Sequence, residues 1–188
     1  MVEVASSGGR IVVAHATTPE GMRRSIIAGV ATIEHGDGGT PEIFKLMKEK
    51  NVALCPTLSV EDALAQYRGW KKGTSEPETI KAKRKSFSAA LYAGVTISMG
   101  GDVGVFMHGD NAREMEMMVE YGMQPINVLR SATSVNADVF KINNTVGRIS
   151  PGLFADILVV QGDPSKNIQD IRNVKLVLKN GIIYKNLF

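Results

Sequence analysis

Three polar side chains follow short apolar runs at equivalent positions in the chain. His15 and His35 each come directly after such a run, and Asp102 follows another run and two glycines. If these runs are parallel strands, their carboxyl ends converge on one mouth, which is where active sites of such folds lie. Two imidazoles and a carboxylate at one mouth suit a divalent metal, above all Zn²⁺, and a polar loop region leaves room for water.

The histidines also admit a plainer interpretation. A single histidine in such a loop more often hydrogen-bonds nearby backbone than it binds a metal, but matched positions for His15, His35 and Asp102 favour the metal site. His108, the remaining histidine, lies six residues beyond Asp102. Its position predicts contact with substrate or support for the metal ligands, and an exposed loop histidine without a role is the alternative.

The elements that would position these residues alternate apolar runs with helical segments, the pattern of βα units on a parallel sheet. Thr18-Pro19 and Thr40-Pro41 each offer a capping hydroxyl and a proline for the first turn of a helix. The expected strands cover 11–14, 31–34, 52–55 and 95–99, and the expected helices cover 19–28, 41–50, 77–93, 111–121, 125–133 and 135–140. Residues 57–75 form a long connection, which in compact domains is more often a functional lid than a linker.

The pattern changes after residue 144. Short apolar runs alternate with turn residues from there to the end, and Asn180-Gly181 is a strong indication of a type I′ hairpin turn. We therefore expect an α/β part over residues 1–145 and a small β part over residues 146–188.

Composition places the chain among ordinary globular proteins. Hydrophobic residues make up 44% and charged residues 22% of its 188 residues. The one cysteine, Cys55, cannot form an internal disulfide and is expected to be a small buried residue. No apolar run approaches the roughly 20 residues that span a bilayer, and no signal peptide is visible near the start. A membrane partner is not expected, and the compartment is not predicted.

The formal net charge of +3 is unevenly distributed. Residues 71–85 hold six basic side chains against two acidic ones. A nucleic-acid surface usually has a broader basic face with stacking aromatics, so this run is expected to be a solvated helix face and nucleic acid is not an expected partner. Arg113 and Glu114 are expected to form an ion pair at the surface, and orientation of the loop that carries His108 is the alternative.

Several short motifs occur in a fixed order along the chain. They are Val12-Val13-Ala14-His15-Ala16, Thr32-Ile33-Glu34-His35-Gly36, Gly100-Gly101-Asp102, His108-Gly109-Asp110-Asn111-Ala112-Arg113-Glu114, and the run from Gly147-Arg148-Ile149 to Ala155-Asp156. As an ordered set these motifs resemble the amidohydrolase superfamily. The most similar branch is the group of imidazolonepropionase-like enzymes and metal-dependent prolidases or carboxypeptidases.

The resemblance implies a fold and a set of ligands. The fold is the C-terminal half of a TIM (β/α)8 barrel, strands five to eight over residues 1–145, followed by a segment of the accessory β-sandwich. The twenty-residue step from His15 to His35 matches metal-ligand histidines after strands five and six, and Asp102 matches the aspartate after strand eight. Gly101 stands where the family usually has threonine, and Thr17 where many relatives carry a second histidine.

The chemistry that the resemblance implies is hydrolysis of amide-type carbon–nitrogen bonds, with Asp102 as general acid and base. Substrates of this group include dipeptides with a C-terminal proline or basic residue, and cyclic amides. By the same resemblance the chain begins just before strand five. The family's His-x-His pair and its carboxylated lysine, or an acidic substitute, therefore have no counterpart in it.

Two function classes remain open at this point. One is a metal-dependent hydrolase portion, and the other is a non-catalytic fragment or interaction subunit without a complete metal site. A half barrel leaves strand side chains uncovered and two sheet edges unpaired. We therefore expect a homo-oligomer, or pairing with an N-terminal half that supplies the other strands.

Overall fold

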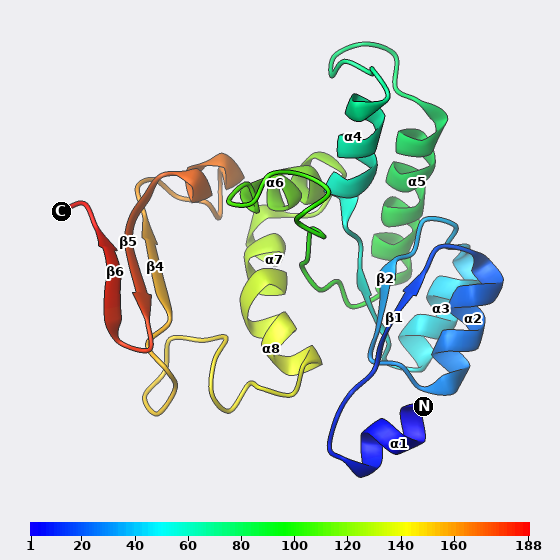
Figure 1. The fold of residues 1–188 in the computed structure, drawn as a ribbon, viewed down its shortest axis with the longest axis horizontal. Coiled ribbons are helices and arrows are strands. Elements are labelled where there is room, and N and C mark those ends of the chain that lie inside the picture. The colour runs from blue at the N-terminus through cyan, green and yellow to red at the C-terminus, as the bar shows by residue number, and fades with distance from the viewer.

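The computed structural model describes all 188 residues as an elongated molecule with a sheet near each end (Figure 1). The strands are β1 Val13–Ala16, β2 Thr32–His35, β3 Ala53–Cys55, β4 Ile157–Val160, β5 Val174–Lys179 and β6 Ile182–Asn186. The helices are α1 Val2–Ser7, α2 Pro19–Ala28, α3 Pro41–Glu49, α4 Leu58–Tyr67, α5 Glu78–Ala93, α6 Ala112–Glu120, α7 Pro125–Arg130 and α8 Asn136–Val139. A π-helical turn at Ser131–Val135 and a 3-10 helix at Ile168–Arg172 complete the elements.

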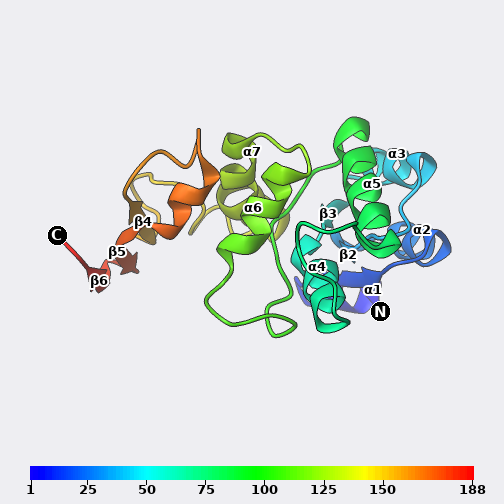
Figure 2. The same cartoon turned by 90° about the horizontal axis from the view of Figure 1, so that it is seen from above.

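The first three strands form a parallel sheet in the order β1-β2-β3, with α2, α3 and α5 along one side of it (Figures 1 and 2). The predicted capping residues start two of these helices. The Thr18 hydroxyl accepts a hydrogen bond from the Gly21 amide at 3.2 Å, and the Thr40 hydroxyl accepts one from Ile43 at 3.4 Å. The predicted α/β class is therefore confirmed, and the half barrel stays a prediction.

The predicted fourth strand over residues 95–99 is shorter than expected. It meets β3 only at the parallel bridge between Leu54 and Ile97. Beyond that bridge, the side chain of Asn136 accepts from the Met99 amide at 3.0 Å and donates to the Met99 carbonyl at 2.8 Å. An amide side chain from α8 thus takes the place of a strand partner at Met99.

The prediction of an irregular connection over residues 57–75 was wrong. Its first half is helix α4, and only residues 68–77 form a loop. The predicted break between helices after Thr133 was also wrong, because α7 runs through the π-helical turn into α8. In that turn the Thr133 hydroxyl donates to the Leu129 carbonyl at 2.7 Å, a bond of the kind that loosens and bends helices.

The C-terminal part is an antiparallel sheet in the order β4-β5-β6, as the turn residues predicted. Asn180 and Gly181 have φ angles of 51° and 77°, the positive values that a type I′ turn requires at both central residues. Strand β6 lies at the sheet edge and is exposed along its whole length. Its apolar side chains Ile182 and Ile183 therefore face solvent.

One apolar core joins the parallel sheet to the helices in the middle of the molecule. It extends from Met22 on α2 and Ile33 on β2 to Met118 on α6 and Ile168 on the 3-10 helix. No helix is both long enough and apolar enough to cross a bilayer.

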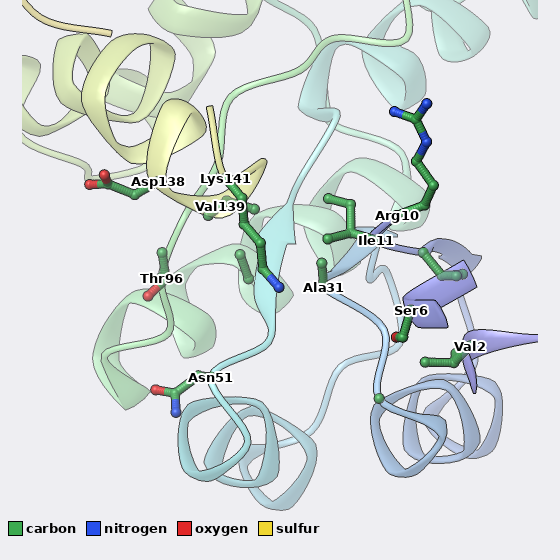
Figure 3. Close-up of a pocket in the computed structure, with 13 residues that line it drawn as sticks. Val2, Ser6, Arg10, Ile11, Ala31, Asn51, Thr96, Asp138, Val139 and Lys141 are labelled. Atoms are coloured by element: carbon green, nitrogen blue, oxygen red, sulfur yellow. The ribbon is translucent and has the colours of Figure 1, made fainter. Parts of the chain in front are cut away.

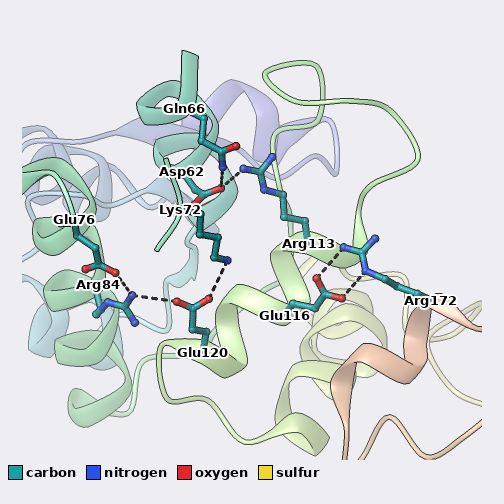
Figure 4. Close-up of polar contacts among 9 residues, drawn as sticks. All are labelled: Asp62, Gln66, Lys72, Glu76, Arg84, Arg113, Glu116, Glu120 and Arg172. Atoms are coloured by element: carbon teal, nitrogen blue, oxygen red, sulfur yellow. Dashed lines mark hydrogen bonds and ion pairs between the residues drawn. The ribbon is translucent and has the colours of Figure 1, made fainter. Parts of the chain in front are cut away.

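Ion pairs brace the helices around this core (Figure 4). Glu120 on α6 accepts from Lys72 at 3.4 Å and from Arg84 on α5 at 3.2 Å. Arg172 forks onto Glu116 through two bonds of 2.5 and 2.8 Å. The expectation of a solvated basic face over residues 71–85 needs correction at Lys83, whose side chain is buried.

Candidate metal site at the carboxyl ends of the parallel strands

Strand register places three polar side chains in one row across the parallel sheet. His15 on β1 lies beside Glu34 on β2, and Glu34 lies beside Cys55 on β3. Register partners in a parallel sheet project from the same face. This row therefore forms the floor of a pocket of about 320 Å³. The pocket is lined by His15, Glu34, His35, Cys55, Thr57, Gly100 and Asp102.

His35 joins this pocket although it is the immediate neighbour of Glu34. Strand alternation would send it to the opposite face, but its φ of 74° is left-handed and breaks the alternation. Its ring meets the His15 ring edge to face, with 4.4 Å between ring centroids and 66° between planes. Asp102 has a φ of 53° and lines the same pocket from the loop after the short fourth strand.

The structure thus brings the two predicted histidines together and places Asp102 at the same mouth. It gathers no group of three or more histidine, cysteine or acidic side chains at metal-binding distance. His108 lies in an exposed part of the 103–110 loop, and it is absent from the residues that line the pocket. Its predicted contact with substrate stays a prediction, as do the ligand roles of the other three residues.

A buried cation holds the turn that carries His35. Lys83 on α5 has a side chain that is 3% exposed; it donates to the His35 carbonyl at 3.0 Å and forms an ion pair with Asp37. Burial lowers the pKa of His35, and the positive charge of Lys83 lowers it further. Both effects favour the neutral imidazole, which is the form that can bind a metal.

Helix α4 begins next to the site and is capped from a distant part of the chain. The carboxylate of Glu114 on α6 accepts from the backbone amides of Leu58 and Ser59 at 2.8 Å each, and from the Ser59 hydroxyl at 2.6 Å. Burial raises the pKa of Glu114, and these three hydrogen bonds oppose that rise.

The predicted surface ion pair of Arg113 with Glu114 was therefore wrong. Glu114 is fully buried, and Arg113 instead pairs with Asp62 on α4 (Figure 4). Adjacent residues on a helix point in different directions, so Arg113 and Glu114 contact α4 at different places.

Sequence reasoning missed Glu34 and Thr57 as pocket residues, and it treated Cys55 as a plain buried residue. The two-residue alternation of the strands, counted across from His15, would have indicated both Glu34 and Cys55. Burial, and then the negative charge of Glu34, raise the pKa of the Cys55 thiol, so it stays protonated.

Two glycines beside Asp102 make room for this packing. A Cβ atom at Gly100 would lie 2.7 Å from the Cys55 sulfur, which is closer than real contacts allow. A Cβ atom at Gly101 would lie 3.2 Å from the Phe106 ring and 3.3 Å from the Ser59 hydroxyl. Gly100 therefore lines the pocket against Cys55, whereas Gly101 lies behind it, against Phe106 and Ser59.

A second cavity of about 430 Å³ lies at the amino ends of the same strands (Figure 3). Ala31 and Thr96 line it from the sheet, Ser6 from α1 and Lys141 from the segment after α8. It contains none of the predicted site residues, so the pocket at the carboxyl ends is the candidate site.

Comparison with known proteins shows what the chain as a whole is similar to. The model of the amidohydrolase family matches residues 1–183. An ochratoxinase from Aspergillus niger is 30% identical over 98% of this chain and 40% of its own length. An uncharacterized protein of Mycobacterium tuberculosis is 29% identical over 96% of this chain and 49% of its own length. The chain thus spans less than half the length of these relatives.

Solved structures show the same similarity. A Xaa-Pro dipeptidase with methionine bound in its active site matches with a TM-score of 0.88 and 35% identity, over 98% of this chain and 47% of that one. A prolidase in complex with N-methylphosphonate-L-proline matches with a TM-score of 0.83 and 29% identity, over the same shares of both chains.

Proposed function

Because the chain belongs to the amidohydrolase family, we propose that it forms part of a metal-dependent hydrolase that cleaves amide or peptide-like carbon–nitrogen bonds. The observation that carries the proposal is the close approach of the His15 and His35 rings in a pocket that Asp102 also lines. The Xaa-Pro dipeptidase and the prolidase among the similar structures support a small, peptide-like substrate.

The donor set of the pocket fits a divalent cation, with Zn²⁺ as the first choice. Imidazole nitrogen and carboxylate oxygen are both good ligands for Zn²⁺, and catalytic zinc sites keep an open position. His15 and His35 would hold one ion, and Asp102 would contribute to a second one in an enzyme with two. The lowered pKa of His35, caused by burial and by Lys83, keeps this imidazole neutral for binding.

The roles of the side chains follow from their chemistry. The chemistry that a bound divalent cation supplies is Lewis acidity, which favours ionisation of an attacking water and polarises the scissile carbonyl. The carboxylate of Asp102 would take the proton from that water and then deliver it to the leaving nitrogen. Asp102 is exposed at the pocket mouth, where substrate can reach it.

Unpaired edges support the proposal that the chain works with a partner. β1 is an edge strand of the parallel sheet, and β6 is an exposed edge strand with apolar side chains. Such edges favour pairing with another chain unless they are covered. We propose that a second copy, or a segment that supplies further strands, covers them and completes the site.

The proposal is tested by metal analysis and hydrolysis assays on the purified chain. Wild type is expected to retain zinc, and to cleave a proline dipeptide when the second copy or the strand-supplying segment completes the site. His15→Ala is expected to lose metal. Asp102→Ala is expected to lose hydrolysis. His108→Ala is the matched control, because it removes the one histidine outside the pocket and should leave metal content unchanged. Equally little metal in wild type and in His15→Ala, without hydrolysis, would refute the catalytic assignment and leave a non-catalytic interaction subunit.

A further inference from the structure

The hydroxyl of Thr57 contacts a predicted metal ligand and is not used for capping. Thr57 occupies the N-cap position of α4, as Thr18 does for α2 and Thr40 for α3. The side chains of Thr18 and Thr40 accept from their own helices, whereas Thr57 makes no such bond. Its Oγ1 instead lies 2.7 Å from Nδ1 of His35 and 2.8 Å from the Pro56 carbonyl oxygen.

Glu114 makes this diversion possible. Its carboxylate satisfies the first two amides of α4, those of Leu58 and Ser59, and the third amide, that of Val60, donates to the Thr57 carbonyl at 3.2 Å, so none of them needs the Thr57 hydroxyl. Thr57 also has a φ of 47°, a conformation that is rare for a β-branched residue and that accumulates at functional sites. The surrounding structure therefore holds this hydroxyl against His35 rather than against the helix.

Counting protons fixes the direction of these two hydrogen bonds. A threonine hydroxyl has one proton to donate and lone pairs with which to accept. Pro56 is buried, and its carbonyl oxygen receives no backbone amide, so the Thr57 proton is its hydrogen-bond partner. The hydroxyl oxygen must then accept from His35, which requires the proton of the neutral imidazole to reside on Nδ1.

We infer that Thr57 is a positioning residue that sets the tautomer of His35, leaving the Nε2 lone pair free for a divalent cation in the pocket. A hydrogen bond to one ring nitrogen commonly selects the nitrogen that binds metal. The inference rests on the proposed function for its biological meaning, but the tautomer is a property of the metal-free chain. The two can therefore fail separately.

The test uses ¹⁵N NMR of the imidazole rings in the metal-free chain at about pH 8, where histidine is neutral. His35 in wild type is expected to show a protonated Nδ1 and an unprotonated Nε2. Thr57→Ser keeps the hydroxyl and should keep this pattern, whereas Thr57→Val keeps the shape, loses the hydroxyl and should lose the preference. A wild-type spectrum with the proton on Nε2 would overturn the inference, whether or not Thr57→Val folds.

A second measurement, calorimetric titration with zinc chloride, connects the tautomer to binding. Thr57→Val is expected to weaken zinc binding about tenfold to a hundredfold, the usual effect of removing a partner of a metal-ligating histidine. Thr57→Ser is expected to bind like wild type. Equal zinc affinity in a folded Thr57→Val would overturn the positioning role. The expected tautomer together with no zinc binding in any variant would refute the proposed function and leave the hydrogen-bond assignment intact.

Discussion

Glu114 offers the sharpest test of how the site is supported, because one buried carboxylate starts helix α4 from another helix. Glu114→Ala leaves the amides of Leu58 and Ser59 without a partner, and both residues are fully buried. Each orphaned buried donor costs about 1–3 kcal/mol, or about 4 kcal/mol for the two. Relief of the carboxylate's own burial offsets part of this, so we expect a net loss of about 3 kcal/mol in the free energy of unfolding.

Glu116 provides the matched control on the same helix. It pairs with Arg172 where the two side chains are 25% and 44% exposed, so Glu116→Ala should cost about 0.5–1 kcal/mol. The assay is urea unfolding followed by circular dichroism, with the slope against urea unchanged between variants. Losses that agree within about 0.5 kcal/mol for the two variants would refute the distant-cap account of α4.

Three further predictions concern the surroundings of the site. Lys83→Met removes the donor to the His35 carbonyl and the partner of Asp37, which is 31% exposed, and is expected to lower the free energy of unfolding by about 1–2 kcal/mol in urea, whereas Lys81→Met, on the exposed side of α5, should have no measurable effect. Burial and Lys83 lower the pKa of His35 in the folded chain. As the pH falls from about 6.5 through that lowered pKa, His35 is therefore protonated in the unfolded chain before it is protonated in the folded chain. The free energy of unfolding should therefore decrease as the pH falls over that range, and it should decrease less steeply in His35→Gln. If melts at a series of pH values give His35→Gln the same slope of stability against pH as wild type, this prediction is wrong. Light scattering after size-exclusion chromatography should give at least twice the mass of one chain, and a well-folded monomer would show that the exposed β6 edge does not drive self-association.

Local signals predicted those parts of the fold that depend on neighbouring residues. Thr18-Pro19 and Thr40-Pro41 start α2 and α3 because a capping hydroxyl and a proline act within one turn. Asn180-Gly181 closes its hairpin for the same reason. By contrast, α4 was missed because its cap, Glu114, lies 56 residues beyond Leu58 in the chain.

The candidate site shows the same division. That His15 and His35 end at the same mouth follows from parallel strands ending together, and the sequence pattern predicted both strands to within two residues, but the contact of the two rings also requires the left-handed φ of His35. The contribution of Thr57 could not be predicted, because it requires a left-handed backbone and a cap from α6 that frees the hydroxyl. Side chains beside a site thus depend on tertiary contacts more than the candidate ligands do.

His15 and His35 are proposed to bind one divalent cation together, and X-ray absorption at the zinc edge of the zinc-loaded chain examines that ion's ligands. We predict nitrogen ligands at about 2.0–2.1 Å with the multiple-scattering pattern of two imidazoles, and the loss of one imidazole in either His15→Ala or His35→Ala. The Cys55 thiol should contribute no sulfur at about 2.3 Å. A zinc environment that is unchanged in both histidine variants, or one that contains sulfur, would show that the ion is not held by His15 and His35 as proposed.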